Sequence, residues 1–433
     1  NQMIVFNVTR VMNPSSVTGA ANVVVETKDT MGGMIDGPTN VATDVITAGA
    51  LASPMSWVAG TRTPGVTDTA TLSFNVTGSV GPGGKFVVEL PSASAVGCTR
   101  SWSMPAVPSV EVSSPGGMEM TGEWEAHAST LEITTSVNSS AIAEGSRVVV
   151  RVYNVRTPSC LHTTTAANVS SLDRGGHVVD KPTGVAIASM SKGALGTPLR
   201  WTAANSVPAV TTDSTVSFRS VGGIKEGGRI KVVLPSVGWS MPSAPVIEFS
   251  RPSAVNATAA WNAGTRTLLI TTTSGEIAEG AAVELIVKDT VTPPSVTESG
   301  SASVETYEKA MVANRTVWRA IDAGSLSTSA IAAGMLSNVS WVLSASTPGV
   351  TNNATLEMVL SGRIGGNDGI KIVLPEVPSA AHSWSLGGSD HRRVAEFVEP
   401  SAGGAGVSRT VWDHASRTLL VITDNSTSIV SGS

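Results

Sequence analysis

The alternation of apolar and polar residues predicts short β-strands along the whole chain. Residues 70–74, for example, read Ala-Thr-Leu-Ser-Phe and place an apolar side chain at every second position, the period of a half-buried strand. Turns containing Gly and Pro separate such runs about every 8–12 residues, and no segment has a helical period. The pattern therefore predicts an all-β chain of antiparallel sandwiches.

The strand pattern occurs three times, and tryptophans mark equivalent places in each unit. Because the same three places recur in every unit, we expect these side chains to pack in cores rather than to form a sugar-binding platform. Trp318 lies outside the pattern and is expected between domains. The fold predicted is three tandem immunoglobulin-like β-sandwiches. The nine repeated tryptophans are Trp57, Trp102, Trp124, Trp201, Trp239, Trp261, Trp341, Trp384 and Trp412.

The third unit is split between the two ends of the sequence. In the first two units an apolar strand follows Ile142 and Ile277, whereas the equivalent Ile429 is followed by only four residues. The strand that fits there is Met-Ile-Val-Phe-Asn-Val, at residues 3–8. The domains expected are a donor segment 1–36, sandwiches 37–180 and 181–320, and an incomplete acceptor sandwich 321–433.

Strand donation to another protomer would complete the third unit. The donor segment is expected to supply two strands, near residues 3–9 and 21–26, to the core and sheet edge of the acceptor. Such a heterologous contact repeats without closing and gives a filament. The side chains expected to enter the acceptor are Met3, Ile4, Val5, Phe6, Val8, Val23 and Val25.

Two other arrangements satisfy the same split repeat. The ends could pair within one chain, which would give a monomeric adhesin or carbohydrate-binding stalk closed into a ring. Alternatively, residue 433 could continue into another copy, so that the 433 residues are one segment of a long tandem-repeat surface polypeptide.

The two cysteines, Cys98 and Cys160, both lie in the first unit, and the other units have none. In an extracellular protein this favours one disulfide within that unit; two unpaired thiols are the alternative.

Nine Asn-x-Ser/Thr triplets are spread over all units, more than the composition alone predicts, and they favour a glycosylated extracellular surface. Two loops rich in Pro and hydroxyl residues, 157–165 and 292–297, fit O-linked sugar and ordinary exposed connectors equally well. The predicted N-glycan acceptors are Asn7, Asn75, Asn138, Asn168, Asn256, Asn314, Asn338, Asn353 and Asn425.

Charge and motif content argue against other classes of function. The net charge of −5 is spread out and no basic stripe is present, so nucleic acid is not an expected partner. No apolar run is long enough to span a membrane. The sequence shows no catalytic motif, cofactor fingerprint or metal-ligand set, so no enzyme activity is expected.

Taken with the repeats and sequons above, the chain resembles glycosylated, filament-forming extracellular proteins of algae and other microbial eukaryotes, built from tandem immunoglobulin-like domains. Its split third unit resembles donor-strand complementation in bacterial pilins, in topology only and with no shared motif. These resemblances imply a structural surface fibril that binds other copies of itself, carries covalent glycans and catalyses no reaction.

Overall fold

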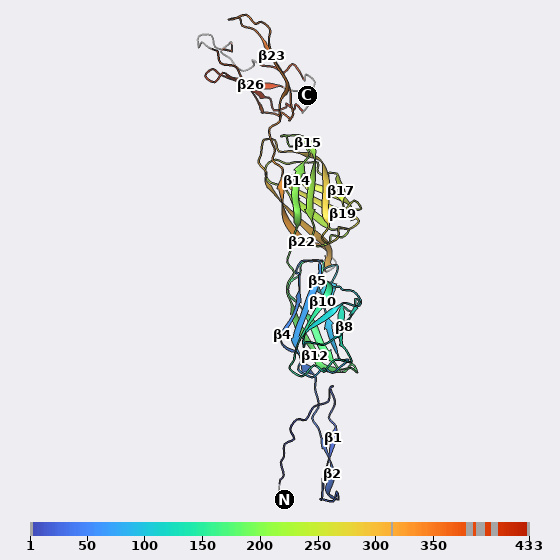
Figure 1. Ribbon diagram of the computed structural model, residues 1–433. Helices are drawn as coiled ribbons and strands as arrows, with labels where there is room; N and C mark the ends of the chain where they lie inside the picture. The colour runs from blue at the N-terminus through green and yellow to red at the C-terminus, as the bar shows by residue number, and fades with distance from the viewer. Residues whose placement is uncertain (1–2, 313–314, 378–383, 387–394, 400–405, 431–433) are drawn as a thin grey trace.

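The computed structural model of the protein describes residues 3–312, 315–377, 384–386, 395–399 and 406–430. The molecule is an elongated row of a hairpin and three domains (Figure 1). Strands make up nearly all of the regular structure, so the predicted all-β fold class is confirmed. The one helix in these ranges, α1 (Ala93–Val96), is a single turn that begins after Ser92 and ends at Gly97.

Domain 1, residues 49–187, is a sandwich whose strands form one hydrogen-bonded network. The order is β7-β10-β5-β4-β12-β11-β6-β9-β8, with β3 beside β12. Neighbours are antiparallel, except that β12 runs parallel to β3 and β4. The strands are β3 Gly49–Ala50, β4 Ala52–Ala59, β5 Thr67–Asn75, β6 Lys85–Glu89, β7 Val110–Ser114, β8 Met120–Glu125, β9 Thr130–Thr135, β10 Arg147–Arg156, β11 Thr165–Leu172 and β12 Val178–Ile187.

Domain 2, residues 193–328, repeats this topology strand for strand. Its order is β17-β20-β15-β14-β22-β21-β16-β19-β18, with β13 beside β22. The strands are β13 Gly193–Ala194, β14 Gly196–Ala203, β15 Thr211–Arg219, β16 Arg229–Val233, β17 Ile247–Arg251, β18 Asn256–Asn262, β19 Thr267–Ser274, β20 Ala282–Val291, β21 Ser301–Val312 and β22 Arg315–Thr328.

Each of these two domains is built around a pair of tryptophans, as the repeat pattern predicts. Trp57 and Trp102 meet edge to face in domain 1, with ring centroids 5.9 Å apart, and Trp201 and Trp239 meet at the same distance in domain 2. All four are buried, so they contribute to the cores and not to a surface platform. Trp318 lies in β22, where the guanidinium of Arg229 from the same domain covers its ring.

Domain 3, residues 334–430, has fewer strands among its described residues. They form two separate sheets, β23-β24 and β25-β27-β26, which are not joined to each other. Relative to domain 2, the counterparts of β20, β21 and β22, and of the strands β13 and β17 that pair with two of them, are missing from the described residues. The strands are β23 Ser337–Leu343, β24 Ala354–Val359, β25 Gly369–Val373, β26 Val407–Asp413 and β27 Thr418–Thr423.

Ahead of domain 1, the strands β1 (Asn22–Lys28) and β2 (Met34–Ala42) form an antiparallel hairpin that joins no other sheet. Residues 3–9, expected as a strand, have no ladder partner in this single chain. The sequence predicts two strands in the donor segment, whereas the equivalent closing segments of domains 1 and 2 each contain three, β10–β12 and β20–β22. The last strand of each segment runs past the boundaries expected at 36, 180 and 320, so those boundaries fall within strands.

Candidate assembly site: the donor segment and the open third domain

Residues 3–11 align with β10 and β20, and they share one unusual backbone angle with these strands. Arg10, Asn154 and Asp289 each lie four residues before an aligned proline, and each has a positive φ, of 63°, 57° and 54°. In β10 and β20 the ladder changes register at this residue. A positive φ is uncommon outside glycine, so its recurrence at one aligned position supports the alignment independently of side-chain pattern.

The aligned side chains differ sharply in burial. Ile4, Phe6 and Val8 are 82%, 77% and 69% exposed. Their counterparts in β10 and β20 are at most 2% exposed and fill the two cores. Val11, which the sequence analysis did not single out, is also exposed and aligns with the buried Val155. The six counterparts of Ile4, Phe6 and Val8 are Val148, Val150, Val152, Val283, Leu285 and Val287.

The hairpin β1–β2 matches the closing hairpin β11–β12 of domain 1. In its turn, the Gly33 N–H donates to Asp29 Oδ1 at 2.7 Å, as the His177 N–H donates to Asp173 Oδ1 at 2.9 Å. Val25 aligns with Val169, which is fully buried, whereas Val25 itself is about half exposed. Residues 3–42, called the donor segment from here on, therefore contain counterparts of all three strands that close domains 1 and 2, and two of these counterparts, β1 and β2, are already strands.

The remaining predicted donor side chains are placed in keeping with this alignment. Val23 is half exposed and aligns with the buried Ala167. Met3 and Val5 are exposed and align with outward-facing positions of β10. They therefore lie on the outer face of this strand and not on the face that would enter the core.

The core of domain 3 is open on the side where these strands would lie. Trp341 is 37% exposed, whereas the equivalent Trp57 and Trp201 are at most 1% exposed. On β24, Leu356 and Met358 are only partly buried, although their counterparts in β5 and β15 are completely buried. Domain 3 therefore exposes apolar surface that its sister domains cover with β10 or β20.

The edge of β25 also matches the donor hairpin in charge. In domain 2, Lys231 of β16 lies 3.8 Å from Glu305 of β21, and Val232 pairs with Val304. The equivalent positions are Lys371 on β25 and Glu26 on β1 for the ion pair, and Ile372 and Val25 for the apolar pair. Opposite charges and apolar pairs would thus meet across the new ladder.

The donor segment and domain 3 lie at opposite ends of the molecule (Figure 1). Phe6 and Val8 do not pack on domain 3 of their own chain, and the ring-closed arrangement is not the one adopted here. Among the described residues of the single chain, no strand pairs with residues 3–9 or joins the two sheets of domain 3.

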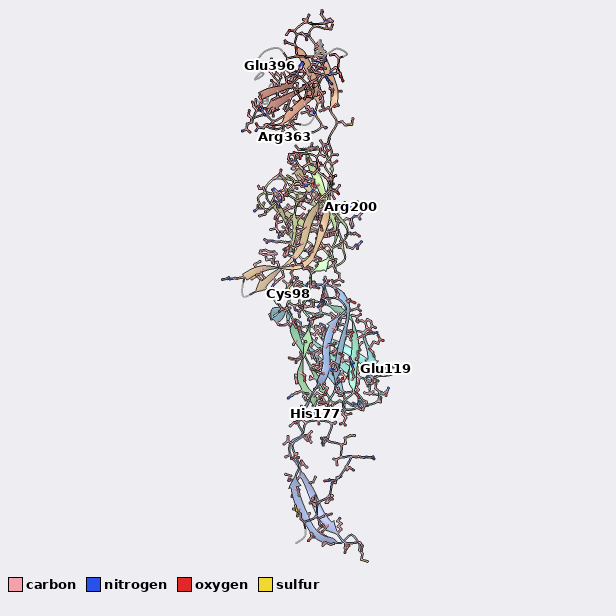
Figure 2. All side chains as sticks on the ribbon, turned by 90° about the vertical axis from the view of Figure 1, so that its left-hand side faces the viewer. Cys98, Glu119, His177, Arg200, Arg363 and Glu396 are labelled. Carbon is pink, nitrogen blue, oxygen red and sulfur yellow. A yellow bond between two sulfur atoms is a disulfide. The ribbon has the colours of Figure 1, made fainter. Side chains whose placement is uncertain are left out.

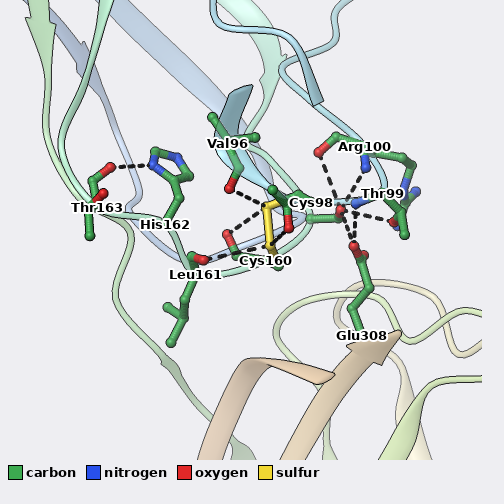
Figure 3. Close-up of a disulfide and its surroundings, with 11 residues drawn as sticks. Val96, Cys98, Thr99, Arg100, Cys160, Leu161, His162, Thr163 and Glu308 are labelled. Atoms are coloured by element: carbon green, nitrogen blue, oxygen red, sulfur yellow. Dashed lines mark hydrogen bonds between the residues drawn. A yellow bond between two sulfur atoms is a disulfide. The ribbon is translucent and has the colours of Figure 1, made fainter. Parts of the chain in front are cut away.

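Cys98 and Cys160 form a disulfide, with Cα atoms 5.5 Å apart, at the end of domain 1 nearest domain 2 (Figures 2 and 3). Next to it, Glu308 of domain 2 accepts hydrogen bonds from the Thr99 N–H and from Ser159 Oγ, both at 2.8 Å. The disulfide thus stabilises the loops that carry the contact between domains 1 and 2.

The predicted glycan acceptors are mostly accessible. Asn75 is the exception, since it is half-buried in β5 and its side-chain amide donates to the Ser53 carbonyl at 2.9 Å. Asn314 lies outside the described residues. The exposed acceptors are Asn7, Asn138, Asn168, Asn256, Asn338, Asn353 and Asn425.

The described ranges contain no group of three or more His, Cys, Asp or Glu side chains placed to bind a metal ion. They also contain no helix that is both long and apolar enough to cross a bilayer. The expectation that the protein is not an enzyme stays a prediction.

No protein-family model and no curated protein matches the chain. Among solved structures, the C-terminal domain of the antigen I/II-family protein AspA of Streptococcus pyogenes is 9% identical, with a TM-score of 0.21, and the match covers 72% of this chain and 98% of that one. The C-terminal domain of the AgI/II polypeptide BspA of Streptococcus agalactiae is 8% identical, with a TM-score of 0.21 and coverage of 70% and 98%. BcpA, the major pilin subunit of Bacillus cereus, is 6% identical, with a TM-score of 0.21 and coverage of 81% and 83%. At these scores the function must be argued from the chain's own geometry.

Proposed function

We propose that the protein is a structural subunit of an extracellular, glycosylated fibril that polymerises head to tail. The donor segment of one copy completes domain 3 of the next, and the subunit carries no catalytic activity. The observation that supports this most directly is the three-strand correspondence. Residues 3–42 share the apolar pattern, the positive φ at Arg10 and the hairpin of the segments that close domains 1 and 2, and domain 3 lacks such strands among its described residues. Apolar burial and main-chain hydrogen bonds would drive the association.

The spacing along the chain fits a continuous row of domains. Between the end of β12 at Ile187 and the start of β13 at Gly193 lie five residues, and between the end of β2 at Ala42 and the start of β3 at Gly49 lie six. With its hairpin seated in another copy's domain 3, domain 1 would follow that domain as domain 2 follows domain 1. The glycans would coat the outside, because Asn7 aligns with Arg151, an outward-facing residue of β10.

The register of β10 on β5 and of β20 on β15 predicts which residues meet. Val149 pairs with Ser73, and Glu284 pairs with Ser217. By alignment, Val5 of one copy should lie opposite Glu357 of another. Directly opposed residues of antiparallel strands have Cα atoms about 4.5–5.5 Å apart, within the range that a disulfide spans.

A full-length variant carrying Val5→Cys and Glu357→Cys tests the proposal. Mild oxidation should give a ladder of covalent multimers on a denaturing, non-reducing gel. The off-register control, Val5→Cys with Val359→Cys, places the cysteines about 7–8 Å apart and should cross-link far less. Monomers cross-linked within themselves would indicate the ring-closed adhesin or carbohydrate-binding stalk, and absence of any cross-link would overturn both arrangements.

The intact mass of the denatured native protein distinguishes a subunit from a segment of a long tandem polypeptide. A noncovalent fibril predicts 44.1 kDa of polypeptide plus sugar. A much larger chain would mean that the same strands close successive domains of one polypeptide.

A further inference from the structure

A hydroxyl–carboxylate motif recurs in the donor hairpin and in the closing hairpins of domains 1 and 2. In each, the aspartate N–H donates to a hydroxyl on the neighbouring strand, and that hydroxyl donates back to the carboxylate. The pairs, with the two distances in that order, are Thr27–Asp36 (2.9 and 3.0 Å), Ser171–Asp180 (3.0 and 2.6 Å) and Thr306–Asp322 (3.1 and 3.4 Å).

Inside the two complete domains, this aspartate is fully buried and is held by a loop of the sandwich. The Thr77 hydroxyl donates to Asp180 in domain 1. In domain 2, the backbone N–H groups of Val221 and Gly222 donate to Asp322 at 3.1–3.3 Å. Thr77 and Val221 are equivalent residues. Thr77 lies three positions before Val80 and Val221 three positions before Ile224, and both of these apolar residues form an isolated β-bridge. A buried carboxylate is tolerated because it is hydrogen-bonded on both sides.

A glycine completes each of these two pockets. A Cβ atom on Gly49 would collide with the Asp180 carboxylate, and one on Gly193 would collide with the Asp322 carboxylate. Each glycine begins a Gly-Ala-Leu sequence. The close approach explains why a larger residue would not fit.

Domain 3 has the same pocket parts. Gly334 begins the equivalent Gly-Met-Leu sequence, and Ser361 Oγ lies against it as Thr77 Oγ1 lies against Gly49. Ser361 and Gly362 precede Ile364, whose bridge to Ile429 repeats that of Val80 to Ile142 and that of Ile224 to Ile277. Within the described ranges, neither Ser361 nor Gly362 donates to a carboxylate. Asp36, for its part, is exposed at the surface of the hairpin.

We propose that the Asp36 carboxylate enters this pocket in domain 3 of a second copy, where the Ser361 hydroxyl and the Gly362 N–H donate to it. This inference rests on the proposed strand donation and adds the polar contact that fixes its register. The pocket of domain 3 lies at the same end of its domain as the equivalent pocket of domain 1. Arg363, next to the pocket, lies at the end of domain 3 that faces domain 2 (Figure 2). His177, in the hairpin turn of domain 1, lies at the corresponding end of its own domain (Figure 2).

A buried aspartate selects one register because every other register penalises it. A slip by one residue would turn Asp36 to the opposite face of the sheet. A slip by two would bury its charge without the loop donors, which costs several kcal/mol in general. Apolar side chains tolerate a slip more readily, so the carboxylate supplies specificity that Phe6 and Val25 alone do not.

The experiment introduces Asp36→Asn or Ser361→Ala into the Val5→Cys, Glu357→Cys chain. The protein concentration at which half of the chains cross-link is then measured. Loss of a hydrogen bond to a charged group should raise this half-cross-linking concentration about tenfold to a hundredfold in either variant. Asp44→Asn, which removes the same charge from the linker after the hairpin, is the matched control and should leave it unchanged.

The outcomes separate the anchor from strand donation itself. If the parent chain cross-links and Asp36→Asn behaves like Asp44→Asn, donation stands and the anchor is wrong. If the parent does not cross-link, donation itself fails. Because the proposal has the two residues bonded to each other, either single change already removes the contact, and the double variant Asp36→Asn, Ser361→Ala should be little worse than either one. Fully additive losses would mean that the residues act separately and would overturn the direct contact.

Discussion

Glu308 of domain 2 accepts a hydrogen bond from Ser159 of domain 1 at 2.8 Å, and the glutamate is only 3% exposed although it lies between two domains (Figure 3). The Thr99 N–H donates to the same carboxylate oxygen. A carboxylate this buried holds the two domains in one orientation, since reorientation would strip it of its donors. The junction between domains 1 and 2 is therefore a specific contact rather than a flexible tether.

Replacing Glu308 with alanine should loosen this junction. Hydrogen bonds to a buried charged group contribute roughly 1.5–3 kcal/mol. Amide hydrogen exchange at Thr99 should accelerate by about tenfold to a hundredfold, whereas amides in the middle of β10 should keep their rates. Glu298→Ala, an exposed change in the same domain, is the control. Equal protection of Thr99 in both variants would contradict the role assigned to Glu308.

Removing the disulfide should destabilise domain 1 selectively. Cys98 and Cys160 are separated by 62 positions, and a loop of this length stabilises by about 4 kcal/mol in the chain-entropy model. The double change to serine should lower the urea midpoint of domain 1 and leave that of domain 2 nearly unchanged. Limited proteolysis along the urea series, with the fragments assigned to each domain by mass spectrometry, follows the two transitions separately. A common shift of both midpoints would show that the junction couples the domains.

The burial of Asp322 should make the stability of domain 2 depend on pH. Desolvation raises the pKa of this carboxyl to about 6, against the opposing effect of the Val221 and Gly222 N–H groups. Because the pKa in the folded state lies above the unfolded value of about 3.9, the folded state binds more protons than the unfolded state at pH values between these two pKa values. This contribution to stability is fully present below pH 4 and is lost as the pH rises towards about 6.

Asp322→Asn should flatten that part of the stability curve, measured by urea unfolding between pH 4 and 7. Asp289→Asn is the matched control, because Asp289 is exposed and its positive φ suits asparagine, the residue found at the equivalent position 154. A curve for Asp322→Asn that is parallel to the control would contradict the assignment.

Glycan occupancy should follow side-chain accessibility. We expect Asn-to-Asp conversion after enzymatic deglycosylation at exposed acceptors such as Asn138 and Asn353, and none at Asn75, whose amide is engaged in the sheet. Peptide mapping by mass spectrometry measures each site. Conversion at Asn75 would show that modification precedes folding of β5, and conversion nowhere would remove the support for an extracellular location.

Period-2 alternation was sufficient to predict the cores of domains 1 and 2, because residues such as Leu72 and Val150 face inward at every second position and are completely buried. It missed β2 and β12, whose sequences are broken by Pro38 and Pro182 and do not alternate. Alternation describes burial on one face, whereas these two strands share ladder hydrogen bonds and an aspartate that bonds to a hydroxyl on the neighbouring strand.

The aspartate pocket also escaped prediction, because no single copy of it is a recognisable motif. A signal does exist in the sequence: Asp-Gly-Pro-Thr at 36–39 matches Asp-Lys-Pro-Thr at 180–183. Domain 2 has Asp322 without the Pro-Thr, so the match is incomplete. Only the structure shows that all three aspartates bond to a neighbouring hydroxyl.

A pair of adjacent substitutions in the first donor strand should give opposite results. Phe6 aligns with the buried Val150 and Leu285, so Phe6→Glu would place a charge in the acceptor core. Val5 aligns with Glu284, an outer-face position of β20, and should lie opposite Glu357, so Val5→Lys should be tolerated. Both side chains are exposed in the single chain, and neither change should alter the folding of domains 1 and 2.

Truncating a buried phenylalanine costs about 3–5 kcal/mol, so a charge at Phe6 should weaken assembly by more than a hundredfold. Filament length in negative-stain electron microscopy and sedimentation of polymer measure the effect. Deleting residues 1–42 should have the same consequence and leave domain 3 open to proteolysis, because its exposed core is then never covered. Long filaments formed by the Phe6→Glu or the truncated chain would mean that lateral contacts or covalent continuity hold the fibril together, and that strand donation does not.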